Sequence, residues 1–365
     1  MPEPLKNVYH PGFFEAFTHT AKQVIPEFRK QAFLNQVFDR NWQEMELKQR
    51  IRQIAASLHS HLPGSYPEQI SLIQKMTEHI KKNGESSFPY LFFPEFIGMY
   101  GLEHLSPSLK AMEILTCFIS CEFAIRPFIV HYPAEVMKQM ESWSLHSDHH
   151  VRRLASEGCR PRLPWAMALP VFKKDPSPLF PILNNLKKDE SLYVRKSVAN
   201  NLNDIAKDHP DRVISLVQKW KGLGKETDWI IRHGCRTLLK KANPQAYQVF
   251  GLNQNPGCSI CKLKLHSSQI RIGEELEFSF QLTNETKSEA VFRLEYVIHF
   301  NKANGKPSPK IFSLKEKAFQ PGSYSIRKRQ SFKELTTRRH YPGKHQLGII
   351  VNGKEMVTKT FQLSK

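Results

Sequence analysis

Apolar residues recur at every third and fourth position through most of residues 1–250, and Pro and Gly separate one such run from the next. This spacing places apolar side chains on one face of an α-helix. It predicts helices over residues 45–62, 68–82, 109–123, 134–143 and 212–220. The first 250 residues are therefore expected to form an all-α domain.

The pattern changes to strict alternation of apolar and polar residues beyond residue 257. Alternation is clearest over residues 276–282, 292–298 and 347–351, and the last of these runs into Asn352-Gly353, a typical two-residue hairpin turn. Several short strands within about 105 residues favour an immunoglobulin-like β-sandwich. The sequence predicts a multidomain chain: an all-α domain over 1–250, a linker over 251–257 and an all-β sandwich over 258–365.

Charge narrows the choice of partner. The chain has 53 Lys and Arg against 34 Asp and Glu, a net charge of +19, which favours a polyanion. An apolar content of 40% excludes a disordered chain. The sequence offers no apolar run long enough for a membrane span and no signal-peptide core, so we expect a cytoplasmic protein with its six cysteines reduced.

The β-domain is the more basic part, with 20 Lys and Arg against 9 Glu. Two of its basic clusters, Arg327-Lys328-Arg329 and Arg338-Arg339-His340, are expected to lie between strands. Such loops suit a clamp on the DNA backbone. The alternative is an ordinary solvated surface.

A weak repeat runs through the second half of the helical part. Arg152, Arg195 and Arg232 each follow a turn that contains Asp, and they lie 43 and 37 residues apart. Repeats of about 40 residues that open a helix are typical of HEAT-like solenoids. The arginines are then expected either to line one face and bind phosphates, or to pair with the Asp of the neighbouring repeat.

Three carboxylates stand out in this part. Glu122 lies in the apolar run 115–125, which we expect to be helical, where a charge needs a partner such as Arg126 or a function. Glu157 has Arg153 one turn before it, and the helical pattern puts Asp204 on a polar stripe.

Carboxylates in a basic groove have no obvious use in simple DNA binding, because they repel phosphate. They suit a reaction that develops positive charge, since an anion then binds the transition state better than the ground state. Hydrolysis of an N-glycosidic bond is such a reaction, because the sugar becomes oxocarbenium-like, as it does in glycoside hydrolysis.

Three stretches resemble the AlkC branch of the HEAT-like alkylpurine DNA glycosylases, some members of which carry an immunoglobulin-like C-terminal domain. They are residues 156–166, 194–204 and 229–234. The resemblance implies a monofunctional 3-methyladenine DNA glycosylase that releases cationic alkylated bases from double-stranded DNA and leaves an abasic site.

The resemblance also implies roles for individual residues. The related AlkD branch has a catalytic Asp four residues after an aromatic, the spacing of Phe118 and Glu122 here. Glu157 and Asp204 then complete an acidic pocket, and Trp165 and Phe118 stack near the lesion. The arginines expected to hold the DNA backbone are Arg152, Arg153, Arg160, Arg195, Arg232, Arg338 and Arg339.

No cofactor or metal is expected. Cys258 and Cys261 form a lone thiol pair, whereas a structural zinc site needs four ligands. His149 and His150 offer metal ligands beside Asp148, but Asp148 is interpreted as a helix cap. We expect a monomer that does not bind membranes. The main alternative is a non-catalytic HEAT scaffold that binds nucleic acid or an acidic protein.

Overall fold

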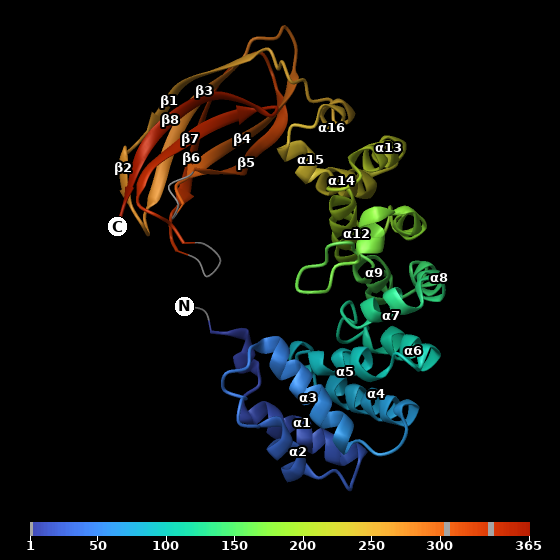
Figure 1. Cartoon of the computed structure of the whole chain (residues 1–365). Helices are drawn as coiled ribbons and strands as arrows, with labels where there is room; N and C mark the ends of the chain where they lie inside the picture. The colour runs from blue at the N-terminus through green and yellow to red at the C-terminus, as the bar shows by residue number, and fades with distance from the viewer. Residues whose placement is uncertain (1–2, 303–306, 335–338) are drawn as a thin grey trace. The chain divides into compact units, whose positions relative to one another are not determined.

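The computed structural model describes residues 3–302, 307–334 and 339–365. Within these ranges the chain is helical up to Val249 and forms strands from Cys258 onward (Figure 1). It divides into two compact units, one of Met1–His209 and Trp220–Gly234 and the other of Pro210–Lys219 and Cys235–Lys365. The predicted class, a helical solenoid followed by an immunoglobulin-like sandwich, is confirmed.

The first unit is a series of helices in which each packs on a helix close to it in the chain: α3 on α5, α5 on α7, α7 on α8, α8 on α9, α9 on α12 and α12 on α14. Its α-helices are α1 (Pro11–Val24), α2 (Lys30–Val37), α3 (Leu47–His61), α4 (Tyr66–Lys82), α5 (Phe92–Tyr100), α6 (Leu105–Leu115), α7 (Ile125–His131), α8 (Pro133–Trp143), α9 (His149–Gly158), α10 (Pro170–Lys174), α11 (Phe180–Asn185), α12 (Leu192–Ile205) and α14 (Lys225–Gly234). Three short 3₁₀ helices connect them: η1 (Leu5–Val8), η2 (Phe88–Leu91) and η3 (Ser177–Leu179).

Local sequence signals explain where several of these helices begin. Ser65 and Glu68 form a reciprocal capping box at the start of α4. The carboxylate of Asp148 accepts the amide of His150 and caps α9, as expected. The predicted helices over 45–62, 68–82, 134–143 and 212–220 are confirmed as α3, α4, α8 and α13 (Pro210–Trp220). No helix of the described ranges is both long and apolar enough to span a bilayer.

The prediction of one helix over residues 109–123 is wrong beyond Leu115. There α6 ends, and residues 116–124 form a turn-rich connection to α7. Thr, Cys, Phe, Ile and Ser dominate this stretch and have only moderate helix propensity. Its polar groups bond locally instead, and the Ser120 hydroxyl donates to the Glu122 carboxylate at 2.6 Å. Glu122 therefore lies on a connection between helices rather than inside one.

The second unit contains the strands in two antiparallel-rich sheets, together with α13, α15 (Arg236–Lys240) and α16 (Pro244–Val249). One sheet has the order β1-β3-β6 and the other β2-β8-β7-β4-β5. The strands are β1 (Cys258–Leu265), β2 (Gln269–Arg271), β3 (Glu275–Asn284), β4 (Ala290–Phe300), β5 (Ser308–Phe319), β6 (Gly322–Ser331), β7 (Gly343–Val351) and β8 (Lys354–Ser364).

The alternating pattern of the sequence correctly marks the core of this sandwich. Every second residue of β3, from Leu276 to Leu282, is buried, and so are Leu347, Ile349 and Val351 on β7. Asn352 and Gly353 both have positive φ, at 45° and 79°, and join β7 to β8 as the predicted hairpin turn.

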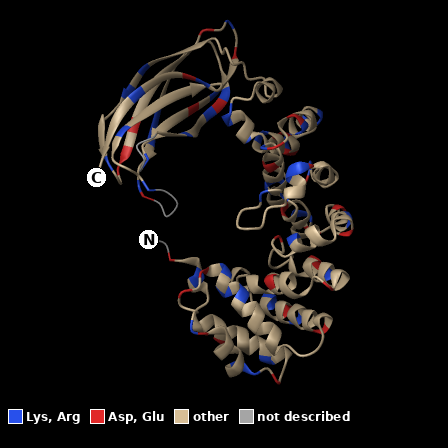
Figure 2. Cartoon of the chain, viewed as in Figure 1, with Lys and Arg blue, Asp and Glu red and all other residues tan. Residues whose placement is uncertain are grey.

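The cluster Arg327-Lys328-Arg329 was expected between strands, and this prediction is wrong, because all three residues lie within β6. Register places Arg329 directly opposite Glu277 of β3, and the Glu277 carboxylate also accepts a hydrogen bond from Arg327. Cross-strand pairing with this acid allows the strand to carry three successive cations. Figure 2 shows the basic and acidic residues along the chain.

Candidate active site

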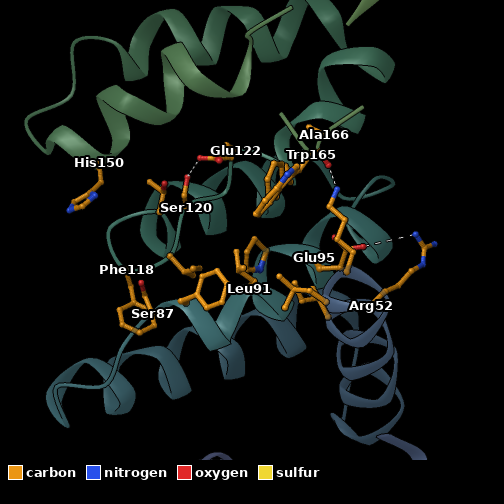
Figure 3. A pocket seen from close by; sticks show the side chains of 18 of the residues that line it. Arg52, Ser87, Leu91, Glu95, Phe118, Ser120, Glu122, His150, Trp165 and Ala166 are labelled. Carbon is orange, nitrogen blue, oxygen red and sulfur yellow. Dashed lines mark hydrogen bonds and ion pairs between the residues drawn. The ribbon is translucent and has the colours of Figure 1, made fainter. Parts of the chain in front are cut away.

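A cavity of about 800 Å³ opens in the helical unit between α3, α5, the α6–α7 connection, α9 and the α9–α10 loop (Figure 3). Its apolar lining includes Leu91, Phe118, Phe123, Trp165, Met167 and Tyr193. Its charged and titratable lining consists of Lys48, Arg52, Glu95, Glu122, His150 and Arg153. A concave site with aromatic walls and a few charged groups suits a flat organic ligand that carries charge.

Glu122 lines this cavity. Its Oε2 accepts hydrogen bonds from the Ser120 hydroxyl and from the Arg153 guanidinium, and its side chain is 17% exposed. Within the described residues, no hydrogen bond to Oε1 is present. The suggested partner Arg126 does not hydrogen-bond to Glu122; its guanidinium binds the backbone carbonyls of Gly158, Arg160 and Met167.

The other two carboxylates do not line the cavity. Glu157 lies 2.7 Å from Nη1 of Arg160 and 3.5 Å from Nη2 of Arg153, the i,i+4 pair considered from the sequence. The Asp204 carboxylate accepts one hydrogen bond from Nε of Arg160 and another from Nζ of Lys207, each with a nitrogen–oxygen distance of 3.0 Å. The structure thus connects the three predicted acids in one ionic chain, in which only Glu122 reaches the cavity.

Asp204 is only 2% exposed, so its predicted place on a polar stripe is wrong. The reason is that α12 packs against α9 on one side and α14 on another, which buries the polar positions of α12 with the apolar ones. Glu157, at 5% exposure, is covered in the same way on α9. Any effect of these two acids on a ligand in the cavity acts through charge rather than contact.

Trp165 projects from the α9–α10 loop and is 64% exposed. Its φ of 65° is left-handed, a conformation that L residues other than Gly seldom adopt. Phe118 lines the same cavity from the α6–α7 connection. The structure therefore brings together both aromatic residues that were assigned to lesion stacking.

Two arginines of the repeat, Arg152 and Arg195, occupy equivalent positions. Nη1 of Arg152 donates to the carbonyls of His146 and Ser147, six and five residues before it. Nη1 of Arg195 donates in the same way to the carbonyls of Asp189 and Glu190. Arg152 also pairs with Asp189 of the next repeat, at 2.6 and 3.2 Å. The alternative of pairing between repeats thus holds for Arg152. Its contact with the DNA backbone stays a prediction.

The other arginines that were predicted to bind the DNA backbone differ in how exposed they are. Arg153 and Arg160 belong to the ionic chain described above. Arg232 lies in the last turn of α14 and is half-buried. Arg339 is exposed and lies over the ring of Tyr341, whereas Arg338 falls outside the described residues.

Sequence reasoning missed three charged residues of the cavity: Lys48, Arg52 and Glu95. Lys48 and Arg52 are one turn apart on α3, and Nη1 of Arg52 lies 4.0 Å from Oε1 of Glu95 on α5. Burial raises the pKa of the Glu95 carboxyl, against the attraction of Arg52 and Lys48. All three fall in ordinary amphipathic helices, so periodicity gives no signal that distinguishes them from solvated residues.

Among the described residues, one group has metal-ligand spacing, Asp148, His149 and His150, whose donor atoms lie within 4.8 Å of one another. One Asp148 oxygen already caps α9. The cysteines are free thiols.

Comparison with known proteins decides the family. The solved structure of Pseudomonas fluorescens alkylpurine DNA glycosylase AlkC, bound to DNA containing an abasic site analogue, is 35% identical. It matches with a TM-score of 0.95 over 100% of both chains. The chain belongs to the AlkC family. The resemblance inferred from the three sequence motifs is thereby confirmed.

Further similarities agree with membership of the AlkC family. A sequence family described as "DNA alkylation repair enzyme" matches residues 103–238, and one described as "Uncharacterised protein YhaZ, C-terminal Ig-like domain" matches residues 259–365. The "Uncharacterized protein YhaZ" of Bacillus subtilis is 41% identical over 360 residues, 98% of this chain and 99% of its own. Similarity to the AlkC family therefore extends over both the helical and the β part.

Proposed function

We propose that this protein is a DNA glycosylase that hydrolyses the N-glycosidic bond of cationic alkylated bases of the 3-methyladenine type in duplex DNA. Full-length similarity to a DNA-bound alkylpurine DNA glycosylase carries this proposal. The basic charge of +19 suits a DNA partner, and six free cysteines suit the cytoplasm.

Glu122 is the proposed catalytic residue. As the base leaves, the deoxyribose gains positive charge, and a fixed carboxylate beside it stabilises that state more than the neutral sugar. Ser120 and Arg153 hold Oε2 and so fix the group before the reaction begins. Oε1 then faces the sugar cation or orients the attacking water.

The leaving group makes little demand on the protein. A 3-methylpurine is already cationic in duplex DNA, and it becomes neutral when the bond to the sugar breaks, so no strong general acid is needed. Trp165 and Phe118 offer aromatic faces to a cationic base, a contact that adds about 1–3 kcal/mol per stacked base. Glu157 and Asp204 contribute through their charge, from behind Arg153 and Arg160.

Release of 3-methyladenine from methylated duplex under single-turnover conditions tests the function. Glu122→Gln removes the charge but keeps an oxygen for Ser120, and we expect release to slow by on the order of 10²-fold. Binding to duplex with an abasic site analogue should be retained. Glu103→Gln, an exposed acid that does not line the cavity, is the matched control.

Two outcomes contradict different parts of the proposal. If the unsubstituted protein binds duplex but releases no base, the scaffold alternative is correct. If it releases base and Glu122→Gln releases it equally fast, the enzyme assignment stands and Glu122 has no part in the reaction.

A further inference from the structure

Two cations hold the loop that carries Trp165, and they come from different helices. Arg126 of α7 is fully buried and donates from Nε to the carbonyl of Met167 at 2.8 Å. Lys48 of α3 donates from Nζ to the carbonyl of Trp165 itself. The loop is thus bound at the left-handed residue itself and two residues after it.

These contacts explain how the loop keeps an unfavourable conformation. A tryptophan at a φ of 65° carries steric strain that a glycine at the same position would not. The other contacts of the loop hold its ends rather than Trp165: Arg162 pairs with Asp208, Leu163 and Leu169 are buried, and Leu169 donates to Pro161 at 3.1 Å. Near Trp165, Ala166 donates to Leu163 at 3.3 Å. At 64% exposure the indole adds little packing of its own, so the hydrogen bonds to the carbonyls of Trp165 and Met167 hold the conformation at Trp165.

The two cations differ in kind. Burial lowers the pKa of Arg126 to about 10, and its three bonds to carbonyls also secure the end of α9, so it is part of the folded framework. Lys48 is exposed, lies 5.3 Å from the centre of the Phe123 ring and reaches Trp165 from the opposite wall of the cavity. Lys48 is therefore the contact that ties α3 to the Trp165 loop.

We propose that Lys48 is a positioning residue for the glycosylase reaction: through the Trp165 carbonyl it holds the indole at the edge of the cavity, where the lesion nucleotide stacks. The stacking of a lesion on Trp165 rests on the proposed function. The contact of Lys48 with the Trp165 carbonyl, here called the tether, is seen in the structure and does not depend on that function. Lys48 touches neither base nor sugar in this scheme and acts through Trp165.

Limited trypsin digestion tests the tether without any activity. Arg162–Leu163 is the one bond within residues 160–169 that trypsin can cut, because Pro161 protects the bond after Arg160. Loss of a hydrogen bond from a charged donor should populate the open loop about tenfold more, so Lys48→Met should be cut at Arg162 about tenfold faster. Lys48→Arg keeps a charged donor and should restore resistance, and Lys75→Met, an exposed lysine away from the cavity, should match the unsubstituted protein.

Single-turnover base release at saturating protein tests the positioning role. Lys48→Met should lower the rate about tenfold, with Lys48→Arg near the unsubstituted rate. A lysine that only bound phosphate would instead weaken duplex binding and leave the saturated rate unchanged.

Equal cleavage of Lys48→Met and Lys75→Met would overturn the tether, and equal saturated rates would overturn the positioning role. Absence of base release by the unsubstituted protein would refute the glycosylase function, while the digestion result would still decide the tether.

Discussion

Arg160 is the most informative residue of the ionic chain for stability. Its side chain is 8% exposed, and it donates to Glu157 at 2.7 Å and to Asp204 at 3.0 Å. Arg160→Met keeps much of the apolar stem but leaves both buried acids without this partner. Asp204 retains Lys207, whereas Glu157 retains, among the residues that the structure describes, only Arg153 at 3.5 Å.

Removal of one partner from a buried ion pair costs about 3–5 kcal/mol, because the charge left behind is neither solvated nor paired. We expect Arg160→Met to lower the free energy of unfolding by this amount. Chemical unfolding followed by circular dichroism at 222 nm, which reports on the helices, measures it. Arg162→Met is the matched control, because its pair with Asp208 is 36% and 26% exposed and such pairs contribute about 0–1 kcal/mol.

A further variant separates unpaired charge from lost packing. Adding Glu157→Gln and Asp204→Asn to Arg160→Met removes the stranded charges and should recover most of the lost stability. If Arg160→Met costs no more than Arg162→Met, the two acids are solvated in the native protein. That result would refute the burial of Glu157 and Asp204 against Arg160, and the two acids could then contact a ligand directly.

Two further changes test other parts of the chain. Burial raises the pKa of the Glu95 carboxyl in the folded protein. Ionised Glu95 therefore destabilises the folded state above this pKa, and the destabilisation is lost as the pH falls through it. Glu95→Gln should therefore raise the melting temperature at pH 7.5 and not at pH 4; a difference independent of pH would contradict this. Gly353→Ala should cost more than about 1 kcal/mol, because φ is 79° and the new Cβ would lie 2.6 Å from Ala242 and from the Tyr247 hydroxyl. Gly273→Ala, at a φ of 101° with open space around it, should cost less in the same thermal unfolding measurement.

Periodicity predicted the elements that have one buried face. In α3, α4 and α8, and in β3, the pattern of apolar and polar positions follows directly from one face against a core and one toward water. The run from Leu115 to Ile125 has no such contrast, because it is apolar almost throughout. Its irregular backbone is set by tertiary packing and by Ser120, so a pattern-based prediction of helix was bound to fail there.

The site was predictable only as far as residue type and family resemblance reach. Glu122, Phe118 and Trp165 lie together on the cavity, as expected. Lys48 and Glu95 come from α3 and α5, more than twenty residues before the nearest recognised motif residue, and their helices look ordinary in sequence. Their place in the site depends on how the helices pack, which charge and periodicity alone do not encode.

The ionic chain also explains how an acidic site can exist in a DNA-binding protein. Glu122, Glu157 and Asp204 alternate with Arg153, Arg160 and Lys207, so three negative charges are matched by three positive ones. Phosphate approaching this region therefore meets little net repulsion. A sugar cation within the cavity responds to the nearest oxygen rather than to the distant sum, because interaction energy falls with distance. Glu122 differs from the other two acids not in charge, which all three share, but in position, because it alone of the three lines the cavity.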